Sequence, residues 1–248
     1  MAETTVAPPP GYGTVTLLDR QRHRERGIAP HVGRFAASLH AVYLTLPEFV
    51  AAARSNPIVF GQIDTNHWQP LAVTGLEPER NLCVDAAGDW LPGFYCPAYV
   101  RRYPFCTAQV RGDATAMQSV ILVDEQGLGS QPPHLFDARG EPTPRWRELM
   151  RFIEEIDTAC RQTDTFCAAV AELGVLEPFE ADVNPVQGQR KRVTGMWRVD
   201  EGRLNALPAP RLAELMQRGF LARLYAHLMS LDNFQRLLEL DVARVRSA

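Results

Sequence analysis

Short apolar runs separated by turn residues dominate the first 135 residues of the chain. These runs are rich in β-branched or apolar side chains and are bounded by glycine, proline, asparagine or aspartate, a pattern typical of β-strands. A short helix is expected from Leu46 to about Arg54, because Pro47 suits a first helical turn and Asn56-Pro57 ends it. The predicted strands are Thr14–Leu18, Ile58–Ile63, Leu71–Leu76, Leu82–Val84, Ala108–Arg111 and Ser119–Val123.

The pattern changes to a helical spacing after Thr143-Pro144. Apolar residues recur every three or four positions from Trp146 to Leu173, either as one helix or as two that break near Thr163-Asp164. Gly174 is suited to end this segment. We therefore predict an α+β fold, in which a mostly antiparallel β portion packs against a helical C-terminal half that contributes one further strand. That strand is Val193–Val199, and the later helices are Pro210–Arg218, Phe220–Met229 and Leu231–Val245.

Composition divides the chain into a short arm and one domain. Residues 1–13 contain three consecutive prolines and two glycines, so a flexible arm is expected there. Residues 14–245 are expected to form a single domain, β-rich over 14–135 and helix-rich over 143–245. The 248 residues are enough to bury a full core, and 46% hydrophobic residues with 22% charged residues are ordinary for a globular protein.

Charge and hydropathy exclude several classes of protein. The net charge is -3, whereas a nucleic-acid-binding domain is normally basic. No apolar run approaches the about 18 residues that a membrane span needs, and the first residues lack the pattern of a signal peptide. The five cysteines include no C-x-x-C pair and are typical of free thiols in a reducing compartment. We expect a cytoplasmic protein without a nucleic-acid partner or a membrane span, while export by a non-classical route stays open.

The densest group of recognition-type residues lies between Asn81 and Phe105. Aromatic residues and arginine are enriched at binding hot spots, and a guanidinium presents a planar fork to two oxygen atoms. The simpler interpretation is that the aromatic side chains are core and that each arginine pairs with Asp85, Asp89 or Asp113. The predicted binding residues are Asp85, Trp90, Tyr95, Tyr99, Arg101, Arg102 and Tyr103.

The two adjacent arginines are expected to have different roles. Neighbouring side chains point to opposite faces of an extended segment, and they lie about 100° apart on a helix. One guanidinium should therefore pair inward with a carboxylate, with Asp85 as the first choice, while the other stays available to a partner.

Motif searches find no catalytic or metal-binding signature. The patterns G-x-S-x-G, G-x-x-x-x-G-K-[ST], G-x-G-x-x-G after a strand and H-E-x-x-H are all absent. His134 and Asp137 have a spacing that can bind metal, but the prolines before them and Gly140 after them indicate a turn. His227 lies on an apolar helix face, as a buried core histidine does, although a bond to residues 81–105 would couple the two regions. We expect no metal and no cofactor.

Residues 81–105, called the aromatic run below, also resemble part of a known family. Its pattern N-L-x-V-D-x-x-G-x-W, followed by P-A-x-x-R-R-Y-P-F, is similar to the SapC family of bacterial proteins, and so are the tail segments GMWRVDE at 195–201 and YAHLMSL at 225–231. The resemblance covers roughly residues 15–240 in collinear order. It implies a link to the surface layer and to genes for outer-membrane receptors and halogenase-like flavoproteins, and it implies no set of catalytic residues. The peptide-transporter permease of the same name is a different protein.

Three functional hypotheses follow. The leading one is a non-catalytic binding or accessory protein of the bacterial cell envelope, which recognises a protein or peptide through residues 81–105. The alternative is an enzyme, or the partner of one, that acts on a peptide or small natural product beside a flavoprotein. The third, a subunit of a surface lattice, is disfavoured by the missing signal peptide and the unpaired cysteines. The catalytic groups of the enzyme alternative would come from Asp85, Arg101, Arg102, Asp124, His134 and Asp137.

Overall fold

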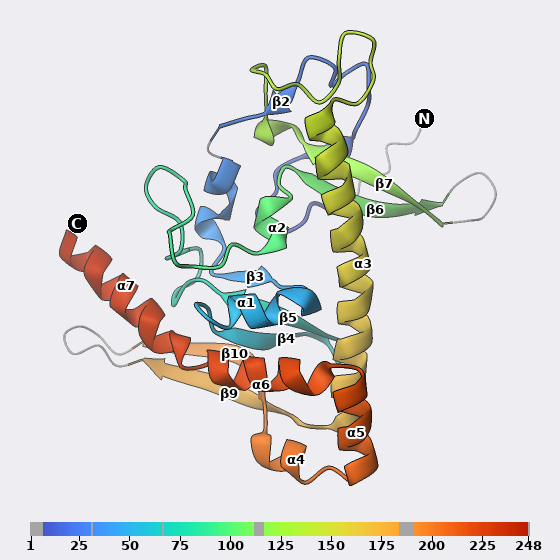
Figure 1. The fold of residues 1–248 in the computed structure, drawn as a ribbon. Helices are drawn as coiled ribbons and strands as arrows, with labels where there is room; N and C mark the ends of the chain where they lie inside the picture. The colour runs from blue at the N-terminus through green and yellow to red at the C-terminus, as the bar shows by residue number, and fades with distance from the viewer. Residues whose placement is uncertain (1–6, 31, 66, 112–116, 184–190, 248) are drawn as a thin grey trace.

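Two antiparallel sheets lie along one long helix in the computed structural model, which describes residues 7–30, 32–65, 67–111, 117–183 and 191–247 (Figure 1). A three-stranded sheet has the order β1-β7-β6, and a five-stranded sheet has the order β3-β5-β4-β10-β9. The strands of these sheets are β1 (Val15–Leu17), β3 (Ala41–Tyr43), β4 (Ile58–Asp64), β5 (His67–Val73), β6 (Phe105–Arg111), β7 (Met117–Asp124), β9 (Leu176–Val183) and β10 (Lys191–Val199). A short pair, β2 (Gly27–Ile28) with β8 (Leu128–Gly129), completes the strands of the described residues.

The helices confirm an α+β fold with its helices concentrated in the second half of the chain. The first half holds short turns of helix, η1 (Val32–Ser38), η2 (Leu46–Glu48), α1 (Phe49–Ala52), α2 (Ala98–Arg101) and η3 (Glu125–Gly127). The second half holds α3 (Pro144–Leu173), α4 (Glu201–Asn205), α5 (Ala209–Gln217), α6 (Phe220–Ser230) and α7 (Asn233–Ser247).

Helix α3 is continuous and connects the cores of the two large sheets. It begins where the Thr143 hydroxyl accepts a hydrogen bond from the Trp146 N–H, and it ends at Gly174, whose φ of 62° is left-handed. Near its start, Trp146 and Ile153 pack with residues of the three-stranded sheet. Near its end, Phe166 packs with residues of the five-stranded sheet. The alternative of two helices broken near Thr163 is therefore wrong.

The buried stripe of α3 gives a direct stability test. Ile153 is 2% exposed, so replacing it with valine removes one buried methylene group. We expect Ile153→Val to lower the free energy of unfolding by about 0.5–1.5 kcal/mol, the usual cost of this change in a core. Urea unfolding measures it, with the exposed Glu155→Ala as the control on the same helix. An unchanged free energy for Ile153→Val would contradict this packing.

Several predicted elements differ from the observed ones. The second half contributes two strands rather than one, because β9 pairs with β10 along its length. Pro178 and the acidic residues at 177, 180 and 182 do not form a strand pattern in the sequence, but β9 is an edge strand, where proline is tolerated. The predicted strand Leu82–Val84 makes only an isolated bridge between Val84 and Trp90, since the chain turns back at Gly88.

The chain before β1 makes several hydrogen bonds to the rest of the protein. Residues 1–6 of the expected flexible arm lie outside the described residues, but residues 10–13 are held against the body of the protein. The Tyr12 hydroxyl donates to the Phe105 carbonyl at 2.9 Å, and Pro10 accepts a 2.6 Å hydrogen bond from the Tyr99 hydroxyl. The Gly13 N–H donates to the Asp124 carboxylate at 2.7 Å. These three hydrogen bonds connect residues 10–13 to the start of β6, to α2 and to the end of β7.

Candidate functional site

The run from Asn81 to Phe105 separates into an inward part and an outward part. Residues 97–100 and 103–105 are buried, whereas residues 85–87, 89 and 92–93 are exposed and Trp90, Phe94 and Tyr95 are half-buried. The separation follows the backbone, because residues 85–96 form a loop and residues 98–101 form α2. Only the outward part, together with Arg101, is available to a partner.

Two of the predicted binding residues belong to the inward part. Tyr99 and Tyr103 are 7% and 6% exposed, and both rings meet the ring of Tyr12 edge-on. Tyr103 also stacks on Phe35 at 3.9 Å between ring centroids and donates its hydroxyl to the Asp124 carboxylate at 3.1 Å. Burial raises the pKa of both tyrosines, so their hydroxyls stay neutral donors. For this pair, the simpler interpretation as core residues describes the structure.

A buried carboxylate, Glu48, organises the boundary between the two parts. One of its oxygens accepts hydrogen bonds from the N–H and the hydroxyl of Thr45, at 2.8 and 2.7 Å. The other accepts the Ala98 N–H, at 2.6 Å, and the Tyr95 hydroxyl, at 3.0 Å. Burial, together with the adjacent Glu48 charge, raises the pKa of Tyr95 to about 12. Glu48 therefore fixes the start of α2 and the orientation of the Tyr95 ring.

Glu48 was missed by the sequence analysis, although a signal for it was present. The sequence Thr45-Leu46-Pro47-Glu48 matches the S/T-x-x-E pattern of a capping box, in which the acidic side chain reaches back to the first N–H of the turn. That pattern predicts the contact to Thr45. It contains no information about Tyr95 and Ala98, which come from a segment about fifty residues later in the chain.

The two arginines do occupy different environments, as expected. The Arg101 side chain is 45% exposed, lies 3.8 Å from the Glu48 carboxylate and donates to the Cys96 carbonyl at 3.1 Å. Its guanidinium also lies over the Phe152 ring of α3, 5.0 Å from the centroid. Arg102 points inward over the Tyr99 ring at 5.0 Å, and its Nε is buried without a hydrogen-bond partner among the described residues.

The expected partner of the inward arginine is wrong. Asp85 accepts the N–H groups of Ala87 and Asp89, both at 2.9 Å, and so closes the turn of its own loop. The backbone hydrogen bond from Asp89, and to a smaller extent the one from Ala87, holds the pKa of the exposed Asp85 carboxyl below its usual value. No described carboxylate pairs with Arg102, which is surrounded by aromatic rings instead.

Helix α7 contacts both the outward loop, residues 85–96, and the segment just before it. Arg236 donates to the Gly93 carbonyl at 3.0 Å and stacks on the Phe94 ring at 4.4 Å from the centroid. Arg244 donates to the carbonyls of Leu82 and Val84 at 2.9 and 2.6 Å. The coupling between the tail and the aromatic run therefore passes through these two arginines. It does not involve His227, which is buried and bonds to Ile58 and Val199.

Three residues of the enzyme alternative, two acids and one histidine, are each held in separate hydrogen bonds. Asp124 is 1% exposed and accepts hydrogen bonds from Gly13 and Tyr103. The His134 ring bonds to the Ser130 carbonyl at 3.1 Å. Asp137 accepts the N–H groups of Arg139 and Glu141 within a turn. The described residues thus do not bring this predicted set together around one cavity.

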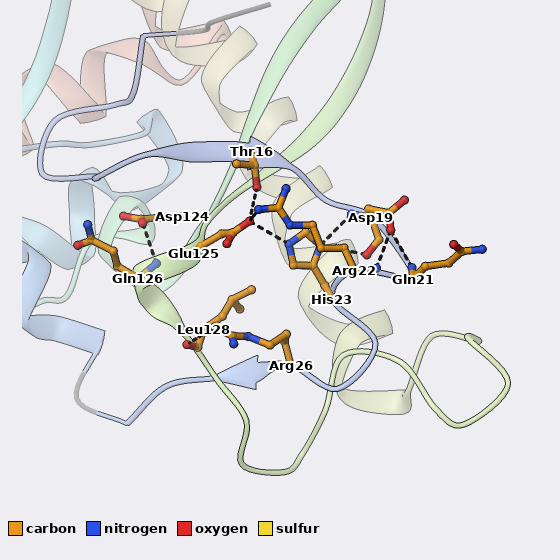
Figure 2. A network of polar contacts seen from close by, with 10 residues as sticks. All are labelled: Thr16, Asp19, Gln21, Arg22, His23, Arg26, Asp124, Glu125, Gln126 and Leu128. Atoms are coloured by element: carbon orange, nitrogen blue, oxygen red, sulfur yellow. Dashed lines mark hydrogen bonds and ion pairs between the residues drawn. The ribbon is translucent and has the colours of Figure 1, made fainter. Parts of the chain in front are cut away.

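A second polar network joins the loop after β1 to η3 (Figure 2). Glu125 forms an ion pair with Arg22, accepts the Thr16 hydroxyl at 3.1 Å and lies 3.6 Å from Nε2 of the buried His23. The Asp19 N–H donates to His23 Nδ1 at 2.9 Å. These contacts hold the charged loop against η3, and they supply no group to the aromatic run.

Neither a metal site nor a membrane span is evident among the described residues. No group of three or more His, Cys, Asp or Glu side chains gathers there in a form that could hold an ion. No described helix is long and apolar enough to cross a bilayer. All five cysteines are free thiols, as expected, and burial raises the pKa of the Cys83, Cys96 and Cys167 thiols to about 12.

One protein family matches most of this chain. The family model described as SapC matches residues 18–237. The chain belongs to the SapC family. No curated protein and no solved structure matches it. The family match includes the aromatic run, Glu48, α3 and the first five residues of α7, so it contains Arg236 but ends before Arg244.

Proposed function

We propose that this SapC-family chain is a non-catalytic binding or accessory protein that recognises a protein or peptide through its outward loop, residues 85–96 with Arg101. The observation that carries the proposal is the anchoring of half-buried aromatic rings. Tyr95 is fixed by Glu48, and Phe94 is fixed by Arg236. Rings that are already held in place lose little conformational freedom on binding, which favours their use at an interface.

The charge of this surface suggests the chemistry of the partner. Arg101 lies over the Tyr95 ring of the loop, 5.9 Å from its centroid, Arg236 lies over the Phe94 ring, and both side chains still reach solvent. A stacked guanidinium keeps donors free for a carboxylate or a carbonyl group. A segment with acidic and aromatic side chains would meet both features. The family resemblance suggests that such a partner belongs to the cell envelope or surface layer of a bacterium, with this chain acting from the cytoplasm.

A pull-down from the native cell with matched variants tests the proposal. We expect Arg101→Ala and Phe94→Ala to reduce capture of the partner at least fivefold. Arg101→Ala should leave the free energy of unfolding within about 1 kcal/mol, because the Arg101 side chain is 45% exposed and its contact with Glu48 is 3.8 Å long. Arg145→Ala is the control, because Arg145 is 56% exposed at the start of α3, away from the loop. Equal capture by all four proteins would contradict recognition through this surface.

A further inference from the structure

A pocket of about 490 Å³ lies between η2, α3 and the turn that joins α5 to α6. Figure 1 shows α5 and α6 beside the C-terminal end of α3, where this turn is located. The volume falls in the range of about 300–1,000 Å³ that is usual for small-molecule sites. None of the residues assigned above to partner recognition lines it. Its lining residues are Leu46, Pro47, Gln162, Thr165, Arg218, Phe220 and Arg223.

The pocket combines an apolar floor with a positively charged rim. Leu46 and Phe220 are 9% and 6% exposed and belong to the main core, so the floor is part of the folded scaffold. Two guanidinium groups and no carboxylate line the pocket, although the net charge of the chain is -3. This concentration of positive charge is therefore local.

Neither arginine is neutralised by a carboxylate of its own. Arg218 stacks on Phe220, with Cζ 4.3 Å from the ring centroid, and its Nη1 lies 3.3 Å from Glu214. Glu214 also pairs with Arg211 at 3.2 Å, so one carboxylate is shared by two guanidinium groups. Arg223 donates to the Gly219 carbonyl at 3.3 Å and pairs with no carboxylate among the described residues. Both guanidinium groups thus retain donors for an external anion.

The turn itself brings these two side chains to one side of the pocket. Gly219 has a φ of 70°, in the left-handed region, and separates the end of α5 from the first residue of α6. Across the pocket, α3 contributes the amide of Gln162 and the hydroxyl of Thr165. The Thr165 hydroxyl donates to the Arg161 carbonyl at 2.9 Å, which leaves its oxygen as an acceptor.

We propose that this pocket binds a small organic anion. Its carboxylate or phosphate group is held by Arg218 and Arg223, because a guanidinium binds two oxygens of such a group at once. Its apolar body packs on Leu46 and Phe220. The neighbouring groove along α3, which shares Pro47 and Gln162, carries the two acids Glu154 and Glu155 against one arginine, Arg151, so its net negative charge disfavours extension of the anionic end in that direction.

Calorimetric titration of the full chain with four probes tests this site. The probes are 4-phenylbutyrate, phenyl phosphate, inorganic phosphate and the neutral 4-phenylbutan-1-ol. We expect at least one of the two aromatic anions to bind, and the tighter of the two identifies the preferred oxyanion. Inorganic phosphate and the neutral alcohol should each bind at least about tenfold more weakly than that anion, because each lacks one of the two features that the pocket recognises.

Three arginine variants assign the binding to the pocket. We expect Arg218→Gln and Arg223→Gln each to raise the dissociation constant of the bound anion about tenfold or more, the loss of one charge-assisted contact. Arg211→Gln is the matched control, since it removes the same charge beside the same Glu214 but does not line the pocket. An unchanged midpoint of thermal unfolding shows that each variant is folded.

Three outcomes would overturn the proposal. The first is the absence of binding by both aromatic anions. The second is an equal loss of affinity in Arg211→Gln, which would mean that only the general surface charge matters. The third is equal affinity for phenyl phosphate and inorganic phosphate, which would remove the apolar part of the site. Capture of a protein partner through residues 85–96 is measured separately, so either proposal can fail without the other.

Discussion

Glu48→Ala is expected to lower the free energy of unfolding by about 3–5 kcal/mol, because it leaves several buried hydrogen-bond donors without an acceptor. Glu48 is 6% exposed, and its two oxygens accept four hydrogen bonds. Without them, the N–H groups of Thr45 and Ala98 lose their acceptor in the interior, and each unsatisfied donor costs about 1–3 kcal/mol. Urea unfolding followed by circular dichroism measures the change.

A second substitution separates the charge of Glu48 from its volume. Glu48→Gln keeps the shape of the side chain but places an amide N–H₂ opposite one set of donors. We expect it to cost about 1–3 kcal/mol, less than alanine. Glu155→Ala, which removes an exposed acid from α3, should stay within about 0.5 kcal/mol of the unchanged protein. Equal stability of Glu48→Ala and Glu155→Ala would show that Glu48 does not organise this region.

His227 should make the stability of the protein fall between pH 6.5 and pH 4. Its Nδ1 lies 2.7 Å from the Ile58 carbonyl, and its Nε2 accepts the Val199 N–H at 3.0 Å, so the folded protein holds it as a neutral ring. Burial lowers the pKa of His227 from 6.5 to about 4. The unfolded chain takes up a proton near pH 6.5, but the folded chain does not do so until about pH 4. Acid therefore favours the unfolded state within this window.

The size of the effect follows from the difference between the two pKa values. The contribution is fully present above pH 6.5, and roughly 3 kcal/mol of it should be lost on going down to pH 4. His227→Gln should remove this part of the pH dependence, whereas His67→Gln, which changes a 54% exposed ring, should not. Free energies of unfolding measured at several pH values test both variants. Identical pH profiles for the unchanged protein and His227→Gln would disprove the neutral, buried state of His227.

Features with a local cause were predictable from the sequence. The helical character of α3 follows from the apolar spacing of Trp146 to Leu173, and its two ends follow from the residues there, whereas its continuity past Thr163 stayed open in the sequence. The β-branched runs that became β4 and β7 were recognised for the same reason. The family was recognised as well, because its motifs are continuous stretches of the chain. Strand β9 was not, since proline and acidic residues are acceptable only through its position at a sheet edge.

Which residues of the candidate site are buried and which are accessible was decided only by the tertiary structure. The sequence identified residues 81–105 as the unusual segment, but it did not distinguish Tyr95 from Tyr99. The two lie four positions apart, yet Tyr95 is half-buried in the loop and Tyr99 is buried in α2. What separates them is the position of Glu48 and of Tyr12, which fold in from remote parts of the chain. The same holds for the pocket of Arg218 and Arg223, whose walls come from three segments. Local pattern determines elements, whereas burial and charge pairing depend on contacts that only the folded chain brings together.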